Sequence, residues 1–147
     1  MSLKDWQNNG WLRPHKTSLQ EVTDLFAIVE RDLQDSQESG LSSDWRFGIA
    51  YNAALKLCTI LIYASGYRSE KNLQHFRTLA ALPLVLGDVK KPDATYLDAC
   101  RVKRNTVEYD MAGVASDEDA DELIEFVIGL KKEVLEWLTF THPHLCT

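Results

Sequence analysis

DWRFGIAYNAALKLCTILIYAS, residues 44–65, is the stretch that decides the fold class. Its small and apolar residues recur every three or four positions, which is the spacing of one face of an α-helix. This face consists of Phe47, Ala50, Ala53, Ala54, Leu57, Cys58, Leu61 and Ala64. Gly66 follows directly and is a typical helix terminator. We therefore expect a long core helix over residues 44–65.

The same periodicity predicts four more helices around this one. The first begins at Ser18, where Glu21 completes a capping-box pattern. A helix over residues 72–86 comes after the core helix, and the positions expected to face inward are Leu73, Phe76, Ala80 and Leu84. The last two helices begin after Pro92, a first-turn proline, and after Ser116, whose side chain is a typical N-cap.

The length of 147 residues fits one domain. We divide the chain into an irregular N-terminal arm at residues 1–16, a helical bundle at residues 17–141 and a C-terminal tail at residues 142–147. The arm contains Trp6 and Trp11, which we expect to pack on the body or on a partner. β-branched alternation is absent, so no sheet is expected. The predicted fold class is all-α, an antiparallel bundle of about five helices with a four-helix core.

Composition and charge limit the classes of function. Hydrophobic residues make up 45% and charged residues 26% of the chain, as in a globular protein. The formal net charge is −6, so a nucleic-acid role would need a local basic patch. The most apolar stretch, residues 49–66, contains Asn52 and Lys56 and is therefore not expected to span a membrane. No signal-peptide pattern is present at the start, and we expect a cytoplasmic protein.

The three cysteines show no paired spacing. Cys58 and Cys100 lie within helical patterns and are expected to be reduced core residues. His142, His144 and Cys146 resemble metal ligands, but chain ends fray and no distant fourth ligand is visible. We therefore expect no disulfide, no metal site and no cofactor.

Arg104 is the most informative residue, because it lies on a helical row of apolar residues. The other members of that row are Leu97, Cys100 and Val107. The row should face the core, where an arginine is costly unless its donors are matched. In one interpretation the side chain is half-buried and grips phosphate with two hydrogen bonds. In the other, which periodicity alone favours, it reaches the surface and pairs with Glu108.

The sequence around this arginine resembles the HEPN superfamily. The family consists of helical, typically dimeric domains, and many members are RNA-cutting toxins encoded with an antitoxin. Its motif is an arginine and a polar residue, followed a few residues later by a histidine. Here Arg104 and Asn105 match the first two positions, and Tyr109 stands where the histidine is expected. The alanine-rich segment AYNAALKL, residues 50–57, is similar to a family helix that carries an inward lysine.

The resemblance implies a chemistry for this site. In the ribonuclease members the arginine stabilises the phosphate charge and the histidine moves the proton, whereas a tyrosine with a pKa of about 10 is a poor base. We expect a weak or inactive metal-independent ribonuclease, or a protein that only binds phosphate. In this arrangement Arg104 holds the phosphate, Asn105 orients the site and Tyr109 takes the place of the histidine. His75 and Leu79 are similar to a histidine–leucine element of the family.

His75 could substitute for the missing histidine only if its helix brings it near Arg104. A histidine beside an apolar stripe is more often structural. Five bases gather against two acids around the motif helix, namely Lys90, Lys91, Arg101, Lys103 and Arg104 against Asp93 and Asp98. The candidate nucleic-acid-binding residues are Arg101, Lys103, Arg104, His75 and Arg77. The alternative interpretation is that these are solvated surface charges.

Two further features indicate surfaces. Trp45 and Phe47 cannot both face the core, so one aromatic is left for a subunit contact, for base stacking or for packing under the arm. Residues 117–125 carry six acids and no base, which suits a helix N-terminus and would also suit a basic partner.

Two functions of different class follow. The first is binding of RNA or a nucleotide by a homodimer of toxin–antitoxin type, with a cognate antitoxin as a further partner. The second is a non-catalytic interaction module or adaptor, which Tyr109 and the acidic net charge favour. An enzyme with an unrelated small-molecule pocket has no residue pattern in its favour.

Overall fold

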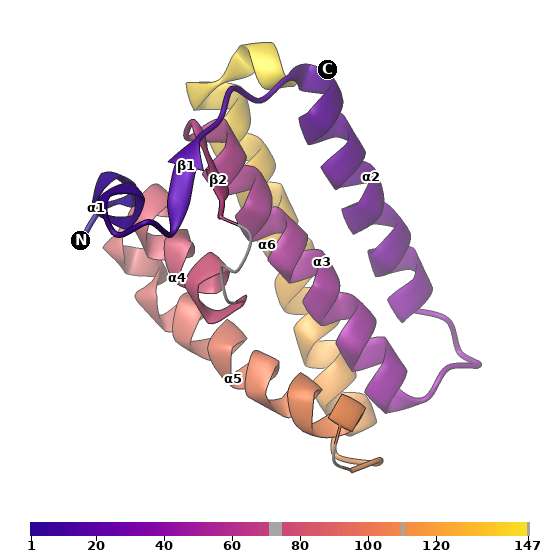
Figure 1. The fold of residues 1–147 in the computed structure, drawn as a ribbon. Coiled ribbons are helices and arrows are strands. Elements are labelled where there is room, and N and C mark those ends of the chain that lie inside the picture. The colour runs from indigo at the N-terminus through magenta and orange to yellow at the C-terminus, as the bar shows by residue number, and fades with distance from the viewer. Residues whose placement is uncertain (71–74, 110, 147) are drawn as a thin grey trace.

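The computed structural model describes residues 1–70, 75–109 and 111–146, and at residues 107–109 it describes the backbone only. Within these ranges the chain forms six α-helices and one two-stranded sheet (Figure 1). The helices are α1 (Leu3–Asn8), α2 (Leu19–Ser36), α3 (Ser43–Ala64), α4 (His75–Leu86), α5 (Lys91–Tyr109) and α6 (Asp117–Thr141), and the strands are β1 (Leu12–Pro14) and β2 (Tyr67–Ser69). The predicted all-α bundle is confirmed, and its five expected helices correspond to α2–α6.

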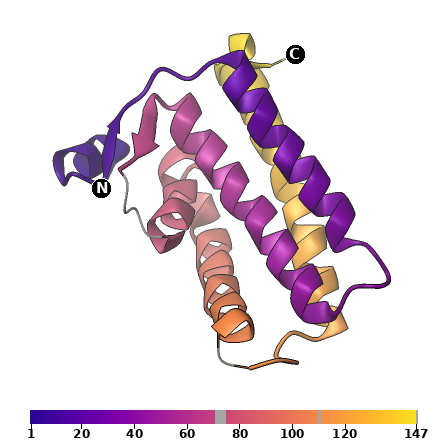
Figure 2. The same cartoon turned by 45° about the vertical axis from the view of Figure 1, so that its right-hand side comes forward.

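α3 is the central helix of the bundle. It contacts α2, α4, α5 and α6, and α2 runs antiparallel beside it (Figure 2). By length and composition α3 could cross a membrane, but 67% of its most apolar window is buried inside the bundle. A helix covered by neighbours on several sides needs this composition. Its polar Asn52 is used within the bundle, because the side-chain amide donates to the buried carboxylate of Asp32 at 2.7 Å.

The helix ends follow the predicted capping chemistry. The Ser18 and Ser116 side chains each accept a hydrogen bond from the backbone N–H three residues on, and Ser116 forms a complete capping box with Asp119. Glu21 does not complete the box at Ser18, since its carboxylate lies against His15 Nε2 at 2.6 Å. The core helix ends at Ala64, as expected for a chain that turns at a glycine with φ +95° two residues later.

The prediction of an irregular arm and no sheet is wrong. Residues 1–16 form α1 and β1, and β1 pairs antiparallel with β2 beyond the end of α3. Trp6 is buried with Leu12 against Ile62 of α3 and Ala81 of α4. The arm therefore packs on the body as expected, but at the C-terminal end of α3. It does not cover Trp45, which lies at the opposite end of that helix and is 64% exposed.

The expected inward face of α4 is only partly right, since Ala80 and Leu84 lie half-buried against the cluster around Trp6. Its buried residues are Thr78, Leu79, Ala81 and Leu82. Phe76, which we expected inside, is 37% exposed, and Leu73 lies outside the described residues. α4 packs on two neighbours at once, with Leu79 and Leu82 in the main core and Ala81 in the arm cluster. These two contacts fix the rotation of the helix, and a single-face pattern could not reveal them.

The end of the chain is also packed. Residues Pro143–Leu145 form a 3₁₀ turn, and Leu145 is buried against the main core. The His142 ring lies against Trp137, with centroids 5.3 Å apart. The segment predicted as a tail is therefore part of the bundle surface over the residues that the structure describes.

Candidate functional site

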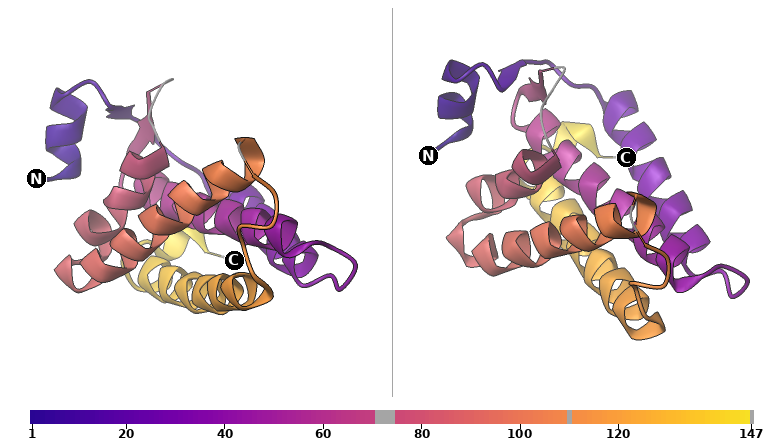
Figure 3. Two further views of the ribbon diagram at one scale, coloured as in Figure 1. Left: turned by 90° about the horizontal axis from the view of Figure 1, so that it is seen from below. Right: turned by 60° about the horizontal axis from the view of Figure 1, so that its bottom comes forward.

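Arg104 lies in the second half of α5, where α5 passes over α3 and the start of α4 (Figure 3). Leu97 and Cys100, which share its helical row, are buried as predicted. The arginine itself is half-buried, and the carbon of its guanidinium lies 5.7 Å from the centroid of the Tyr51 ring. Its Nη1 donates to the Asn105 side-chain oxygen at 3.3 Å. Half-burial fits the first interpretation of Arg104, whereas the Glu108 side chain that the second interpretation requires lies outside the described residues.

Tyr51 of α3 is the buried aromatic residue over which the Arg104 guanidinium lies. Its side chain is 1% exposed, and among the described residues its hydroxyl has no hydrogen-bond partner. Burial raises the pKa of Tyr51 to about 12, although the positive charges of Arg104 and Arg101 act in the opposite direction. The tyrosine is therefore neutral at any physiological pH, and its face is available to the cation above it.

His75 is the first residue of α4, and its ring also lies near Tyr51. The two ring centroids are 6.3 Å apart. Partial burial lowers the pKa of His75, and the positive charges of Arg104, Lys56 and Arg101 lower it further. His75 could take the place of the motif histidine only if its helix brought it near Arg104, and α4 does so. At neutral pH the imidazole is uncharged and can accept a proton.

Three helices therefore contribute one group of residues, which we call the Tyr51 cluster: Tyr51 and Lys56 from α3, His75 from α4, and Arg101 and Arg104 from α5. The Arg101 guanidinium is partly neutralised, since its Nε donates to Asp98 at 2.8 Å. Lys56, Arg101 and Arg104 are the cations of the cluster, and His75 is uncharged at neutral pH. This concentration of positive charge lies in a chain whose net charge is −6.

A row of alternating aromatic and cationic side chains adjoins the cluster. The Arg77 guanidinium lies 3.7 Å from the Trp11 ring centroid and 5.1 Å from that of Phe76. The Arg101 guanidinium lies 5.8 Å from the Phe76 ring centroid. The row leads from the N-terminal arm across α4 to α5 and ends beside the Tyr51 cluster.

Lys103 is placed differently from the other candidates. Its ammonium donates to Asp119 at the start of α6 at 3.0 Å, and it lies 5.9 Å from the Phe47 ring. Lys90 pairs with Asp93 and Glu133, and Lys91 lies 3.8 Å from Asp88. Acidic neighbours therefore match most of the positive charge that the sequence places on and before α5. The cations of the Tyr51 cluster come from both α3 and α5.

Of the predicted catalytic group, Arg104 and Asn105 are in contact, whereas the Tyr109 side chain lies outside the described residues. The same holds for Glu108, so the second interpretation of Arg104 is not decided. Sequence reasoning assigned no role to Tyr51 and placed Phe76 in the core. A signal for Lys56 was present, since the resemblance implied an inward lysine in residues 50–57.

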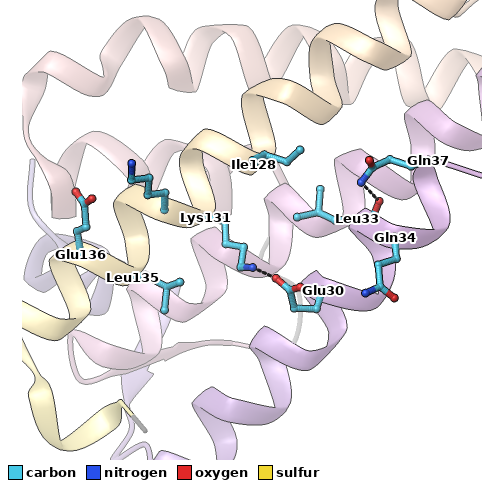
Figure 4. Close-up of a pocket in the computed structure, with 9 residues that line it drawn as sticks. Glu30, Leu33, Gln34, Gln37, Ile128, Lys131, Leu135 and Glu136 are labelled. Atoms are coloured by element: carbon cyan, nitrogen blue, oxygen red, sulfur yellow. Dashed lines mark hydrogen bonds and ion pairs between the residues drawn. The ribbon is translucent and has the colours of Figure 1, made fainter.

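A second hollow lies between α2 and α6, far from the cluster. Its volume is about 420 Å³, and Figure 4 shows Leu33, Ile128 and Leu135 along it, with Lys131 paired to Glu30 across it. Among the described residues no group of three or more His, Cys, Asp or Glu side chains could hold a metal ion. Polar side chains also line the α2–α6 hollow, and two of them, Lys131 and Glu30, already pair with each other. We take the Tyr51 cluster as the candidate site because it contains the motif arginine, Arg104.

Comparison with protein-family models, with curated proteins and with solved structures gives no match to this chain.

Proposed function

We propose that this chain is a HEPN-like protein that binds RNA or a nucleotide through a phosphate group held at the Tyr51 cluster. One observation carries the proposal, which is that three cations, Lys56 of α3 and Arg101 and Arg104 of α5, act on His75 beside the buried Tyr51. Arg104 supplies a half-buried guanidinium, which suits bidentate hydrogen bonding to phosphate oxygens. Arg101 and Lys56 add charge from the flanking helices.

The state of His75 supports an anionic ligand. Three neighbouring cations help to lower its pKa, so the potential around its ring is positive when no ligand is bound. A phosphate beside the ring would favour the charged imidazolium and add one more donor. The binding free energy should therefore be most favourable for a ligand that brings negative charge beside His75 and Arg104.

Ribonuclease chemistry at this site needs a proton acceptor next to the phosphate. Tyr109 occupies the motif position of the histidine and is a poor base at neutral pH. His75 is uncharged at neutral pH while no phosphate is bound, and its ring centroid lies 6.3 Å from that of Tyr51, the ring that the Arg104 guanidinium also faces. We therefore propose that any residual, metal-independent cleavage uses His75 to accept the 2′-hydroxyl proton, with Arg104 stabilising the phosphate charge and Asn105 orienting Arg104.

The test is a titration of labelled single-stranded RNA against wild type and Arg104→Ala at low and moderate salt. We expect wild-type affinity to fall as salt rises, because phosphate binding releases counterions. We expect Arg104→Ala to bind about tenfold more weakly or worse, since a charge-assisted hydrogen bond contributes about 1.5–3 kcal/mol. Incubation of the same RNA with wild type and His75→Gln then measures cleavage.

Lys132→Ala is the matched control, because it removes one positive charge from the exposed face of α6 without touching the cluster. It should bind like wild type. If Arg104→Ala binds as well as Lys132→Ala, the phosphate site is not at the Tyr51 cluster. Loss of cleavage in His75→Gln with unchanged binding would assign the proton transfer to His75.

The second candidate function is a non-catalytic interaction module, for example one member of a toxin–antitoxin pair. The observation in its favour is the 64% exposed Trp45 next to the acidic start of α6, where the Asp117 and Asp121 side chains are 83% and 66% exposed. Both carboxylates pair with Arg46 of α3, and an exposed tryptophan beside such a charged group suits a protein partner. The partner is either a cognate antitoxin or a second copy of this chain.

Light scattering of the purified chain tests the homodimer, and capture of the neighbouring gene product by wild type and Trp45→Ser tests the antitoxin. Loss of either association in the variant supports this function. A monomer that captures nothing and still binds RNA excludes it.

A further inference from the structure

The row that adjoins the Tyr51 cluster is a surface feature with a regular chemistry. It runs Trp11, Arg77, Phe76, Arg101, so that aromatic rings and guanidinium groups alternate. Arg77 holds the arm to α4 through Trp11. Phe76 lies at the start of α4 and is 37% exposed, so part of its ring is open to solvent. A phenylalanine ring that is partly exposed and close to two guanidinium groups is unusual, because phenylalanine is mostly buried.

We propose that Phe76 is a stacking platform for one nucleobase, and that the site therefore takes unpaired nucleotides in preference to duplex. This inference rests on the phosphate site proposed above. A base on the exposed part of the ring would be next to the cations of Arg77 and Arg101. Aromatic stacking combined with positive charge along the backbone is the general mode by which proteins hold single strands.

The positions of the neighbouring residues support a nucleotide as the occupant. Phe76 is adjacent in the chain to His75, whose ring lies against Tyr51 in the cluster. Arg101 is shared, since it lies over Phe76 and also acts on the pKa of His75. The platform and the phosphate site are thus joined by one arginine. A nucleotide carries an aromatic base and a phosphate a short distance apart, which matches this pair of sites.

The same geometry determines whether the site prefers single-stranded or duplex RNA. A stacked base must present its face to Phe76, and in a duplex both faces are covered by neighbouring bases. Duplex RNA could still reach the cations with its phosphates. We therefore expect the duplex to bind through charge alone, with a stronger dependence of affinity on salt than on Phe76.

The experiment uses three RNA probes of equal length and charge per strand: a single strand, the same strand with several abasic positions, and the strand annealed to its complement. Each is titrated against wild type, Phe76→Leu and Phe76→Tyr. For the single strand we expect Phe76→Leu to weaken binding about fivefold or more, which is the lower range for one lost base stack. Phe76→Tyr should retain wild-type affinity, since it keeps the ring.

The abasic strand and the duplex should bind wild type and Phe76→Leu equally. Thermal unfolding followed by circular dichroism checks that both variants are folded, and substitution of a partly exposed residue is expected to be tolerated. Arg104→Ala should weaken binding of all three probes.

The outcomes separate the two proposals. Equal binding of the single strand by wild type and Phe76→Leu overturns the stacking platform, while the phosphate site stands if Arg104→Ala still weakens binding. Wild type that prefers the duplex also overturns the platform. Wild type that binds none of the probes at low salt overturns the phosphate site and the platform together.

Discussion

The carboxylate of Asp44 accepts a hydrogen bond from the backbone N–H of Gly113 at 2.6 Å, which joins two residues 69 positions apart. A second bond from the N–H of Ala115 reaches the other carboxylate oxygen at 3.0 Å. Asp44 lies in the first turn of α3, and the two donors lie between α5 and α6. One side chain thus ties the end of the bundle near Trp45 to the loop that leads into α6.

Asp44→Ala is expected to lower the free energy of unfolding by about 1–3 kcal/mol, because two backbone donors lose a charged acceptor. Asp44→Asn keeps one acceptor oxygen and should be destabilised less. Urea denaturation followed by circular dichroism measures both. An alanine variant as stable as wild type would show that water replaces the carboxylate without loss.

Trp6 and Trp45 are expected to respond in opposite ways to the same substitution. Trp6 is 4% exposed and packs with Leu12 against Ile62. Trp6→Ala should therefore lower the free energy of unfolding by about 3–5 kcal/mol, as for other large-to-small core changes. Trp45→Ala should change it by no more than about 0.5 kcal/mol, because the ring is mostly in solvent. Similar losses in urea titrations of both variants would contradict the assignment of Trp45 to a free surface.

The features that were predictable from the sequence are those set by local chemistry. The caps at Ser18 and Ser116 and the terminating glycine at residue 66 act within a few residues, so their patterns are visible in the chain. The pairing of β1 with β2 was not predictable, because each strand has three residues and the partners are more than fifty positions apart. Three residues show no period, and the pairing depends on where α3 ends.

The candidate site likewise has one part that was predictable from the sequence and one that was not. Arg104 was found because its row on α5 is a local pattern. Its surroundings come from other helices, and the approach of His75 and Tyr51 depends on how α3 and α4 are rotated. That rotation is fixed by packing of α4 on the arm, which places Phe76 outside the core. The periodicity of a single helix does not reveal how that helix is rotated against two neighbours.

Lys103 is expected to act on stability and not on binding. Its ammonium lies 3.0 Å from the Asp119 carboxylate, which also accepts from the Ser116 backbone. Lys103→Ala should lower the free energy of unfolding by about 0.2–1 kcal/mol, as for other solvent-accessible ion pairs. RNA affinity should match that of the Lys132→Ala control. A loss of affinity as large as that of Arg104→Ala would place Lys103 in the binding site after all.

The three thiols are expected to differ in reactivity. Burial raises the pKa of Cys58 to about 12 and that of Cys100 to about 11, so neither forms the reactive thiolate at neutral pH. Cys146 is only half-buried. A chromogenic disulfide reagent should therefore modify one thiol in the native protein and three in denaturant. Cys146→Ser should abolish the native reaction, and a second reactive thiol in that variant would mean that the core opens.

His75 is expected to link both stability and RNA binding to pH. In the unfolded chain its imidazole takes up a proton near the ordinary pKa of 6.5, whereas the folded chain resists protonation until a lower pH. Between these values the unfolded state binds more protons, so stability falls as the pH falls below about 6.5. A bound phosphate has the opposite effect on this ring, because it favours the imidazolium.

RNA affinity should therefore rise as the pH is lowered from about 8 toward the ordinary histidine pKa of 6.5, because the complex takes up a proton more readily than the free protein does. His75→Gln should remove this rise while leaving the Arg104-dependent binding at pH 8 in place. The measurement is a set of RNA titrations at constant ionic strength, with wild type and variant compared at each pH. Because the other three histidines are unchanged in the variant, the difference between the two curves isolates His75. Parallel curves would mean that the phosphate does not lie beside this ring, and would move the ligand away from α4.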